Sequence, residues 1–290
     1  MCAGEAIVRH YPNSYKLKTQ IIDEKHKDLR TLILGNSHNY YGINPKVIGE
    51  HAFNLSNVLQ TPEYDYFLLN KYYGEKSYKL KNVIIVVDFT GFFTDALEVE
   101  DPARAAYYRI YMGYDKHSWL SKYGFELFNS QQYRSKFVPA LKYLFTGKYS
   151  LNCDSAGFGI PTTRPNEVTL EHMRRTCNKV FNNAEVKMGN VKYNHYYLAK
   201  IGEFCKQRGI RLILIQTPLW SEFYNKIGKE ELSAIHAEME FMSHEYGAVS
   251  HNYMNDSRFS GFENFSDASH LSRLGADKFT RILMEDFAGL

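Results

Sequence analysis

The stretch Val83–Phe89, with the sequence VIIVVDF, decides the fold class. Its first five residues are all apolar, so it offers no polar face to water, and its length is that of one strand. A run that is apolar on both faces is typical of a parallel sheet covered by helices on both sides. Leu29–Leu34 (LRTLIL) and Ile210–Gln216 (IRLILIQ) are further candidates for buried strands. We therefore expect a parallel sheet that contains these three segments.

Helix signals alternate with these strands. Thr61 and Pro62 have the form of an N-cap and a first-turn proline, and they predict a helix that runs to about Tyr73. Gly209 and Gly247 each end a further expected helix, Gly209 as a left-handed cap. The remaining expected elements are short strands at residues 52–55 and 248–251 and helices at about 191–208, 229–246 and 271–287.

The order of these elements predicts the architecture. It is strand, strand, helix, strand, helices, strand, helix, strand, helix, which indicates an α/β fold with a three-layer, doubly wound, mainly parallel sheet of five strands of the flavodoxin-like type. Asp101 and Pro102 repeat the cap signal, and from about residue 124 to 185 periodicity is weak and Gly, Pro, Asn and Thr are frequent. We expect residues 1–290 to form a single domain, with residues 101–185 as an insertion of short helices and loops.

The composition excludes some classes of function. Lys and Arg number 35 and Asp and Glu 32, so the formal charge is +3. A dedicated nucleic-acid binder would carry a strong basic excess, so no nucleic-acid partner is expected. The four cysteines, Cys2, Cys153, Cys177 and Cys205, form no CxxC pair and have no His-rich segment near them, so no metal site is expected. Buried free thiols are the favoured state, with one isolated disulfide as the alternative.

The beginning of the chain carries no targeting signal that we recognise. Its first 20 residues contain no apolar run of signal-peptide length, and no segment approaches the length of a transmembrane helix. As written, the sequence is expected to be soluble. Membrane association is expected only if an anchor precedes the given sequence.

A candidate nucleophile follows the first strand. In a doubly wound sheet, ligands bind beyond the carboxyl ends of the strands. There the sequence reads Gly35-Asn36-Ser37-His38. A serine on a tight turn between a strand and a helix can be exposed at the sheet edge, with its N–H near the positive end of that helix. Ser37 is therefore expected to be exposed there and to need a base within hydrogen-bond reach.

A candidate base lies at the other end of the chain. Asp267 and His270 are three residues apart, just before the terminal helix, so one turn can bring both to the same side. The carboxylate would orient one ring nitrogen while the other nitrogen faces a serine, as in a Ser-Asp-His triad. Each piece has a simpler alternative, since Asp267, Ser266 or Ser269 could cap the terminal helix. The combination with a serine at the end of the first strand favours the triad.

At this point the sequence resembles the SGNH, or GDSL-like, hydrolase superfamily. Gly35-Asn36-Ser37 is similar to the first block of that family, and Asp267 with His270 is similar to its last block, DxxH. The resemblance implies Ser37 as nucleophile, His270 as base, Asp267 as the group that orients His270, and no metal or organic cofactor. The text LILGNSHNYYGINP followed by AFNLSNVLQ looks most like poorly characterised branches near polysaccharide-modifying acetyltransferases. Those proteins are often membrane-anchored and act outside the cytoplasm.

The middle blocks depart from the family pattern. The second block normally supplies a glycine N–H to the oxyanion hole, but residues 54–60 contain no glycine, so backbone donors near Ser56 and Leu59 are expected beside that of Ser37. The third block normally carries an asparagine, and here the hydroxyl of Thr90 is the expected replacement. Asp88 would be unfavourable beside an oxyanion unless it points away. Losing one donor typically costs about two to three powers of ten in rate.

Two further residues are candidates for substrate binding, His38 and Asn57, and for His38 the alternative is packing within the serine turn. Aromatic residues make up 15% of the chain, with helical spacing in two groups. Core packing is their favoured role, and a platform for sugar rings is the alternative if they are exposed beside Ser37. The groups are Tyr107, Tyr108, Tyr111 and Tyr114, and Tyr193, Tyr196 and Tyr197.

The expected function is that of a serine esterase-type hydrolase or O-acyltransferase acting on acyl esters, above all acetyl esters, of carbohydrate. The alternative is a non-catalytic protein of the same fold that binds glycan or a partner in cell-surface polysaccharide assembly. The altered middle blocks favour the alternative, and the intact Ser37, Asp267 and His270 favour the enzyme.

Overall fold

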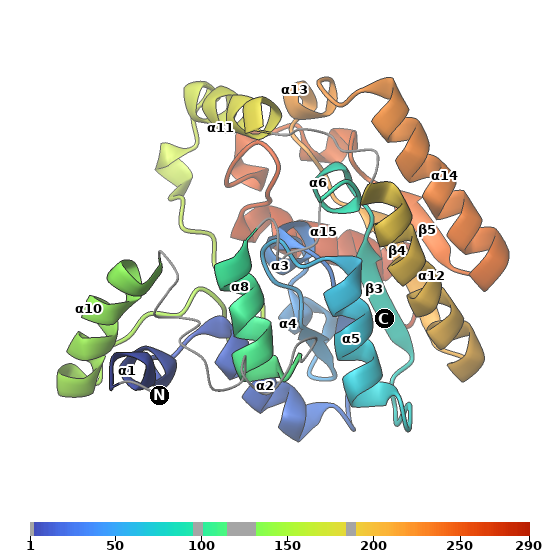
Figure 1. The fold of residues 1–290 in the computed structure, drawn as a ribbon. Helices are drawn as coiled ribbons and strands as arrows, with labels where there is room; N and C mark the ends of the chain where they lie inside the picture. The colour runs from blue at the N-terminus through green and yellow to red at the C-terminus, as the bar shows by residue number, and fades with distance from the viewer. Residues whose placement is uncertain (1–2, 95–100, 115–131, 184–189) are drawn as a thin grey trace. The chain divides into compact units, whose positions relative to one another are not determined.

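Five parallel strands form the sheet that carries the candidate site, in the computed structural model of residues 3–94, 101–114, 132–183 and 190–290 (Figure 1). Their order is β2-β1-β3-β4-β5, and every neighbouring pair is parallel. The predicted α/β doubly wound sheet of flavodoxin-like order is therefore confirmed, with all of its pairs parallel rather than most of them. The strands are β1 Thr31–Ile33, β2 Ala52–Asn54, β3 Asn82–Val86, β4 Arg211–Gln216 and β5 Val249–Asn252.

Helices cover the sheet in two groups. The connections after β2, β3 and β4 include α5 Pro62–Tyr73, α12 Val191–Arg208 and α14 Lys229–Tyr246, which pack side by side (Figure 1). The segments after β1 and β5 supply the second group, which packs together around α15. Right-handed crossovers place these groups on opposite faces. The second group consists of α3 Ser37–Gly42, α4 Pro45–Ile48 and α15 Arg273–Asp286.

The central strands hold the core. Residues Asn82–Val86 of β3 are all buried, and so are all residues of β1. By contrast, every residue of the edge strand β5 is exposed. Burial on both faces explains why the VIIVV run is continuously apolar, while β5, which reads VSHN, gave only a weak strand signal.

Helix boundaries follow local signals closely. α12 and α14 span the predicted residues, and Gly209 and Gly247 end them in the left-handed region, with φ of 64° and 69°. The terminal helix differs, because its N-cap is Ser272, whose hydroxyl accepts from Gly275 N–H at 3.1 Å. The alternative that Ser266, Asp267 or Ser269 caps this helix is therefore wrong.

The contacts divide the chain into two compact units. Unit 1 contains residues 1–24 and 95–155, and unit 2 contains residues 25–94 and 156–290. These boundaries differ from the predicted insertion of residues 101–185, because residues 156–183 belong with the sheet: Ala156 O, for example, accepts from Asn54 N–H of β2 at 3.0 Å. Residues 115–131 and 184–185 of the predicted insertion lie outside the described residues. The assignment of a single domain stays a prediction.

The regions with weak periodicity contain longer helices than predicted. The segment between about 124 and 185 holds α10 Gln132–Thr146 and α11 Leu170–Asn183, of 15 and 14 residues. α11 buries Met173 and Cys177, which lie four positions apart on one face of the helix. Of these two helices, α10 belongs to unit 1 and α11 to unit 2. Unit 1 also contains α1 Ala3–His10, α2 Ser14–Lys25, α8 Pro102–Tyr107 and the π-helical turn Tyr108–Met112.

The tyrosines of unit 1 pack in its interior. Tyr107, Tyr108 and Tyr114 are each at most 8% exposed, and Tyr15 stacks on Tyr107 with ring centroids 5.1 Å apart. Core packing, the favoured role for this group, is therefore what these buried rings perform.

Two further features concern membrane and thiol chemistry. Among the helices that the structure describes, none combines the length and the apolar character needed to cross a membrane. Cys153, Cys177 and Cys205 are buried free thiols, as expected from the sequence. Cys2 lies outside the described residues.

Candidate active site

Ser37 lies on the turn that joins β1 to α3. Gly35 opens this turn with φ of +112°, and a Cβ there would meet Val86 Cγ1 at 2.8 Å, so only glycine fits. Asn36 caps α3, because its Oδ1 accepts from His38 N–H at 2.9 Å. Ser37 is thus the first helical residue, at the carboxyl edge of the sheet. At 9% exposed it is buried, so the expectation of an exposed serine is wrong: the ring of His270, with Nε2 2.8 Å away, packs over its hydroxyl.

The DxxH segment forms a loop before α15 that is held by several backbone contacts. Phe265 and Leu271 pair as an isolated bridge, and Ser266 N–H donates to His270 O at 2.9 Å. From α11, the ring of His172 contacts Ser266 O through Nε2 at 3.1 Å. Thr176, on the same helix, accepts from Ala268 N–H at 3.2 Å. A helix within the predicted insertion therefore supports this loop, and its weak periodicity gave no sign of that role.

The structure brings Ser37, His270 and Asp267 together. Ser37 Oγ lies 2.8 Å from His270 Nε2. The other ring nitrogen, Nδ1, lies 2.9 Å from Asp267 Oδ2 and 3.0 Å from Oδ1. Asp267 Oδ1 also accepts the N–H groups of Ser269 and His270, both at 2.9 Å. This geometry can take a proton from the serine hydroxyl and stabilise the charged imidazole that results.

Electrostatics favour the charged forms of both partners. Burial alone would raise the pKa of Asp267, but the charge of His270 and the hydrogen bonds from His270 and Ser269 outweigh it and hold that pKa well below its usual range. For His270, burial acts to lower the pKa, but the charge and hydrogen bond of Asp267, with the charge of Asp88, raise it overall. The imidazole is therefore a stronger base than an isolated histidine.

The predicted oxyanion donors divide into used and unused groups. Ser56 N–H donates to Asn54 Oδ1 at 3.1 Å, and the Ser56 hydroxyl donates to the same oxygen. Thr90 Oγ1 donates to Asp88 Oδ1 at 3.1 Å. These two donors are committed elsewhere. Among the described residues, the N–H groups of Ser37 and Leu59 make no hydrogen bond, and Leu59 has a φ of 60°, unusual for a side chain of its size.

Both carboxylate oxygens of Asp88 are taken up by contacts with the serine turn and with its own turn. Its Oδ2 lies 2.5 Å from His38 Nδ1, and its Oδ1 accepts from Asn36 Nδ2 at 3.1 Å and from Gly91 N–H at 2.8 Å. His38 is 3% exposed. The structure therefore gives His38 the packing role within the turn, not a place on an open substrate surface. The sequence signalled Asp88 only as an anomaly in the third block.

Asn57 and Asp65 hold the serine turn in place through hydrogen bonds to the backbone of Gly35. Asp65 Oδ1 accepts from Gly35 N–H at 2.8 Å and from Gln60 Nε2 at 2.5 Å, and burial raises the pKa of Asp65 to about 7. Asn57 donates its N–H to Gly35 O at 3.2 Å and its side-chain amide to Gln60 Oε1 at 3.2 Å. At 2% exposed, Asn57 is placed to hold the turn rather than to face substrate. Sequence reasoning missed Asp65. The available signal was an acidic residue near the start of the predicted helix at residues 62–73.

The second tyrosine group joins two helices. The hydroxyls of Tyr193 and Tyr197 on α12 both donate to Glu63 on α5, the latter at 3.1 Å. Tyr196 is 53% exposed. The ring that contacts the site comes from elsewhere: Tyr41 of α3 lies edge-on to His270, with ring centroids 5.4 Å apart.

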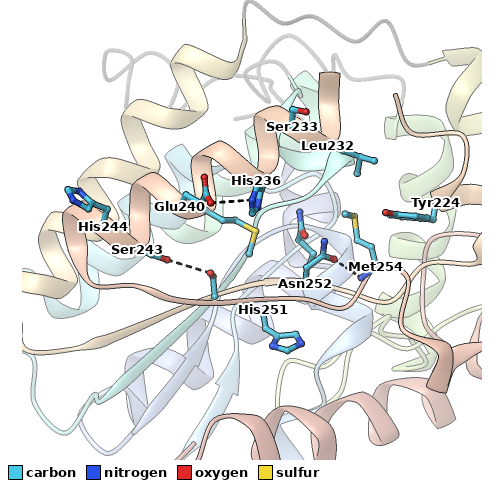
Figure 2. A pocket seen from close by; sticks show the side chains of 13 residues that line it. Tyr224, Leu232, Ser233, His236, Glu240, Ser243, His244, His251, Asn252 and Met254 are labelled. Atoms are coloured by element: carbon cyan, nitrogen blue, oxygen red, sulfur yellow. Dashed lines mark hydrogen bonds and ion pairs between the residues drawn. The ribbon is translucent and has the colours of Figure 1, made fainter. Parts of the chain in front are cut away.

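A cavity of about 910 Å³ lies along α14 and β5, and Ser37 does not line it (Figure 2). Figure 2 shows His236 and Glu240 facing each other across one turn of α14, and their Nε2 and Oε1 atoms are 3.2 Å apart. Both side chains are largely exposed, at 74% and 69%. Ser243 and Ser250 hydroxyls meet at 3.5 Å. No serine in this cavity contacts a histidine, so its groups do not repeat the arrangement at Ser37.

Metal ligands do not gather in the described part of the chain. No group of three or more His, Cys, Asp or Glu side chains there could hold a metal ion.

Comparisons with known proteins give a limited likeness. No family model matches the chain, and no curated protein sequence matches it. Among solved structures, a lipase/acylhydrolase from Enterococcus faecalis is similar over 89% of this chain and 95% of its own, at 10% sequence identity and a TM-score of 0.40. That similarity concerns the general path of the chain and assigns no residue.

Proposed function

We propose that the protein is an SGNH-type serine ester hydrolase or O-acyltransferase. One observation carries the proposal: Ser37 Oγ, His270 and Asp267 form a continuous chain of contacts of 2.8 and 2.9 Å at the carboxyl edge of the sheet. Ser37 and His270 lie 233 positions apart in the sequence, so local turn formation does not account for their meeting.

The proposed reaction begins with attack by Ser37 Oγ on an acyl carbonyl carbon. His270 Nε2 accepts the serine proton as the new C–O bond forms, and Asp267 stabilises the imidazolium. The carbonyl oxygen becomes an oxyanion, for which the unused N–H groups of Ser37 and Leu59 are the proposed donors. Collapse of this intermediate expels the alcohol, which takes the proton from His270, and leaves an acyl-enzyme.

The second half of the reaction separates the two activities. Water attacks the acyl-enzyme in a hydrolase, and a sugar hydroxyl attacks it in a transferase, with His270 again accepting the proton. The bond between the acyl carbon and Ser37 Oγ then breaks, and His270 returns the proton to Ser37 Oγ. We propose acyl esters of carbohydrate, in particular acetyl esters, as substrates, supported by the resemblance of residues 32–60 to the acetyltransferase-like branches. The same resemblance supports a place of action outside the cytoplasm or at a membrane.

The second candidate is a non-catalytic protein that binds glycan or a partner in polysaccharide assembly. The commitment of Ser56 and Thr90 to internal hydrogen bonds favours it, because fewer donors remain for an oxyanion. Two backbone donors remain, which is the number that a minimal oxyanion hole in acyl transfer uses, and for this reason we place the enzyme first.

Labelling with a fluorophosphonate tests the proposal directly. Wild type is expected to label, and Ser37→Ala is expected to lose the label. Ser221, an exposed serine at the start of the short helix α13 Ser221–Tyr224, provides a matched control, since Ser221→Ala should label like wild type. Failure of wild type to label under conditions in which a known serine esterase does would favour the binding protein.

Product analysis then separates the two reactions. Wild type is incubated with an acetylated oligosaccharide, with and without an unacetylated acceptor, and free acetate and acetylated acceptor are measured. Release of acetate alone indicates a hydrolase, and acceptor-dependent acetylation indicates a transferase. Formation of neither product at a rate above that of Ser37→Ala would contradict both.

A further inference from the structure

A second His–carboxylate pair lies beside the proposed base. His38 Nδ1 is 2.5 Å from Asp88 Oδ2, and their side chains are only 2% and 3% exposed. The ring of His38 meets the ring of His270 edge-on, with centroids 5.0 Å apart and an interplanar angle of 76°. The rings of His38 and Tyr41 therefore both pack against the ring of His270.

Asp88 is bound to both chain neighbours of Ser37. Asn36 Nδ2 donates to Asp88 Oδ1 at 3.1 Å and to Oδ2 at 3.4 Å, while His38 contacts Oδ2. Asn36 Oδ1 in turn accepts from His38 N–H at 2.9 Å, which closes the ring of contacts around the serine. One carboxylate thus fixes the residues before and after the proposed nucleophile.

The carboxylate of Asp88 is kept charged in spite of its burial. Burial acts to raise its pKa, but the charge of His38, the N–H of Gly91 and the amide of Asn36 outweigh that effect and lower the pKa overall. The same negative charge is one of the causes that raise the pKa of His270. Asp88 therefore acts on the base electrostatically as well as through the ring of His38.

We propose that Asp88 is a positioning residue of the serine site, which fixes Ser37 through Asn36 and His38 and holds the His38 ring against His270. This inference rests on the proposed function. A purely structural role as N-cap of the short helix α6 Phe89–Phe92 accounts for the contact with Gly91. It does not account for the contacts with Asn36 and His38, which come from a different strand connection.

Asp88→Asn is the first test, because asparagine keeps the size of the side chain and its capacity to cap α6. We expect kcat/KM for an acetyl ester to fall about tenfold or more, since misplaced catalytic groups lose rate steeply. The acid limb of the kcat/KM profile should move to lower pH, because a charge that raises the pKa of His270 has been removed. Glu238→Gln, in a His–carboxylate pair between α12 and α14, is the control and should leave the profile unchanged.

The pH readout depends on the titratable groups around His270. These are Asp267 from its own loop, His38 and Tyr41 from α3, and Asp88 from the β3–α6 turn. The substitution replaces the last one alone. An unchanged kcat/KM with a superimposable pH profile in folded Asp88→Asn would overturn the inference.

Two further measurements test the role of Asp88 if the kinetic comparison fails. NMR titration of the His270 ring in wild type and Asp88→Asn needs no activity, so it still decides if wild type and Ser37→Ala prove equally inactive and the proposed function fails. A lower His270 pKa in the variant supports the role of Asp88, and an unchanged one overturns it. If Asp88→Asn does not fold, His38→Gln takes its place, with the same loss of kcat/KM expected and wild-type kinetics counting against the proposal.

Discussion

Two His–carboxylate pairs in unit 2 look alike in distance and differ in surroundings. His270 Nδ1 lies 2.9 Å from Asp267 Oδ2, and His195 Nδ1 lies 2.7 Å from Glu238 Oε2, between α12 and α14. Asp267 also accepts two backbone N–H groups, whereas Glu238 Oε1 is buried with no partner among the described residues. The pKa of Asp267 is accordingly lowered, and burial raises that of Glu238.

The difference bears on the proposed role of His270 as a base. A carboxylate must be held in its charged form by donors other than the imidazole, and the far ring nitrogen must meet a hydroxyl. His270 Nε2 meets Ser37, while His195 makes no second hydrogen bond within the described residues, and its ring packs on Phe241 instead. Distance between histidine and carboxylate alone does not distinguish the two pairs.

Removing each histidine gives the largest expected contrast. His270→Ala should lower kcat/KM for an acetyl ester by about 10⁴-fold or more, since it removes the proposed base. His195→Ala should stay within about twofold of wild type. Steady-state kinetics on both variants measures this, and equal losses in the two would remove the distinction between the pairs.

Neutralising the carboxylate of the first pair should have the next largest effect. Asp267→Asn is expected to lower kcat/KM by about 10³-fold, because the imidazole loses its orienting and charge-stabilising partner. The acid limb of the pH profile should also move to lower pH, since the charge of Asp267 raises the pKa of His270. A profile recorded from pH 4 to 9 checks both. Loss of rate without any movement of the limb would indicate a structural role only.

Glycine substitutions compare the backbone at the serine turn with the backbone at the end of α12. Gly35→Ala should destabilise the protein by about 3 kcal/mol, because the new Cβ meets Val86 Cγ1 at 2.8 Å and φ is +112°. Gly209 ends α12 at φ of +64°, and a Cβ added there would meet nothing within 4 Å, so Gly209→Ala should cost only about 1 kcal/mol of left-handed strain. Urea denaturation measures the two losses. If Gly35→Ala lowers the free energy of unfolding no more than Gly209→Ala does, the serine turn can adjust to a Cβ at position 35.

A further prediction concerns Asp65, whose carboxyl group accepts from the N–H of Gly35 in the serine turn. Burial raises the pKa of Asp65 from 3.8 to about 7, so the folded state holds an extra proton between these values. Its contribution to stability is present at the acidic end and is lost as pH rises toward 7. Between pH 5 and 7, wild type should lose about 2 kcal/mol more of unfolding free energy than Asp65→Asn, in which Oδ1 can still accept both hydrogen bonds.

The matching change in the pair between α12 and α14 is Glu238→Gln. This variant should also lose less unfolding free energy than wild type as pH rises, since burial raises the pKa of Glu238 as well. Denaturation at the two pH values measures all three proteins. Parallel curves for wild type and Asp65→Asn would mean that Asp65 titrates alike in the folded and unfolded states.

Much of the fold could be predicted because its signals are local. The bounds of α12 and α14 follow from periodicity and from the glycines after them, and β3 follows from continuous apolar character. The contacts by which α11 supports the DxxH loop, through His172 and Thr176, could not be predicted because they are tertiary.

The candidate site could be predicted in its chemistry but only partly in its contacts. The motifs around Ser37 and His270 suggested the residues, yet no local pattern shows that Asp88 binds Asn36 from 52 positions away. Side-chain hydrogen bonds of that range depend on how strands line up, which local patterns do not encode. The loss of Ser56 and Thr90 as oxyanion donors is local by contrast, since each donates to a residue two positions before it, Asn54 and Asp88.

The separation of Ser37 and His270 by 233 positions has a consequence for biosynthesis. A ribosome releases the serine turn long before it adds the DxxH loop, and β4, β5 and α15 must then dock before the two side chains meet. The proposed serine and base are therefore apart until the DxxH loop is in place. If the proposed function holds, the onset of fluorophosphonate labelling during translation would time the completion of folding of unit 2.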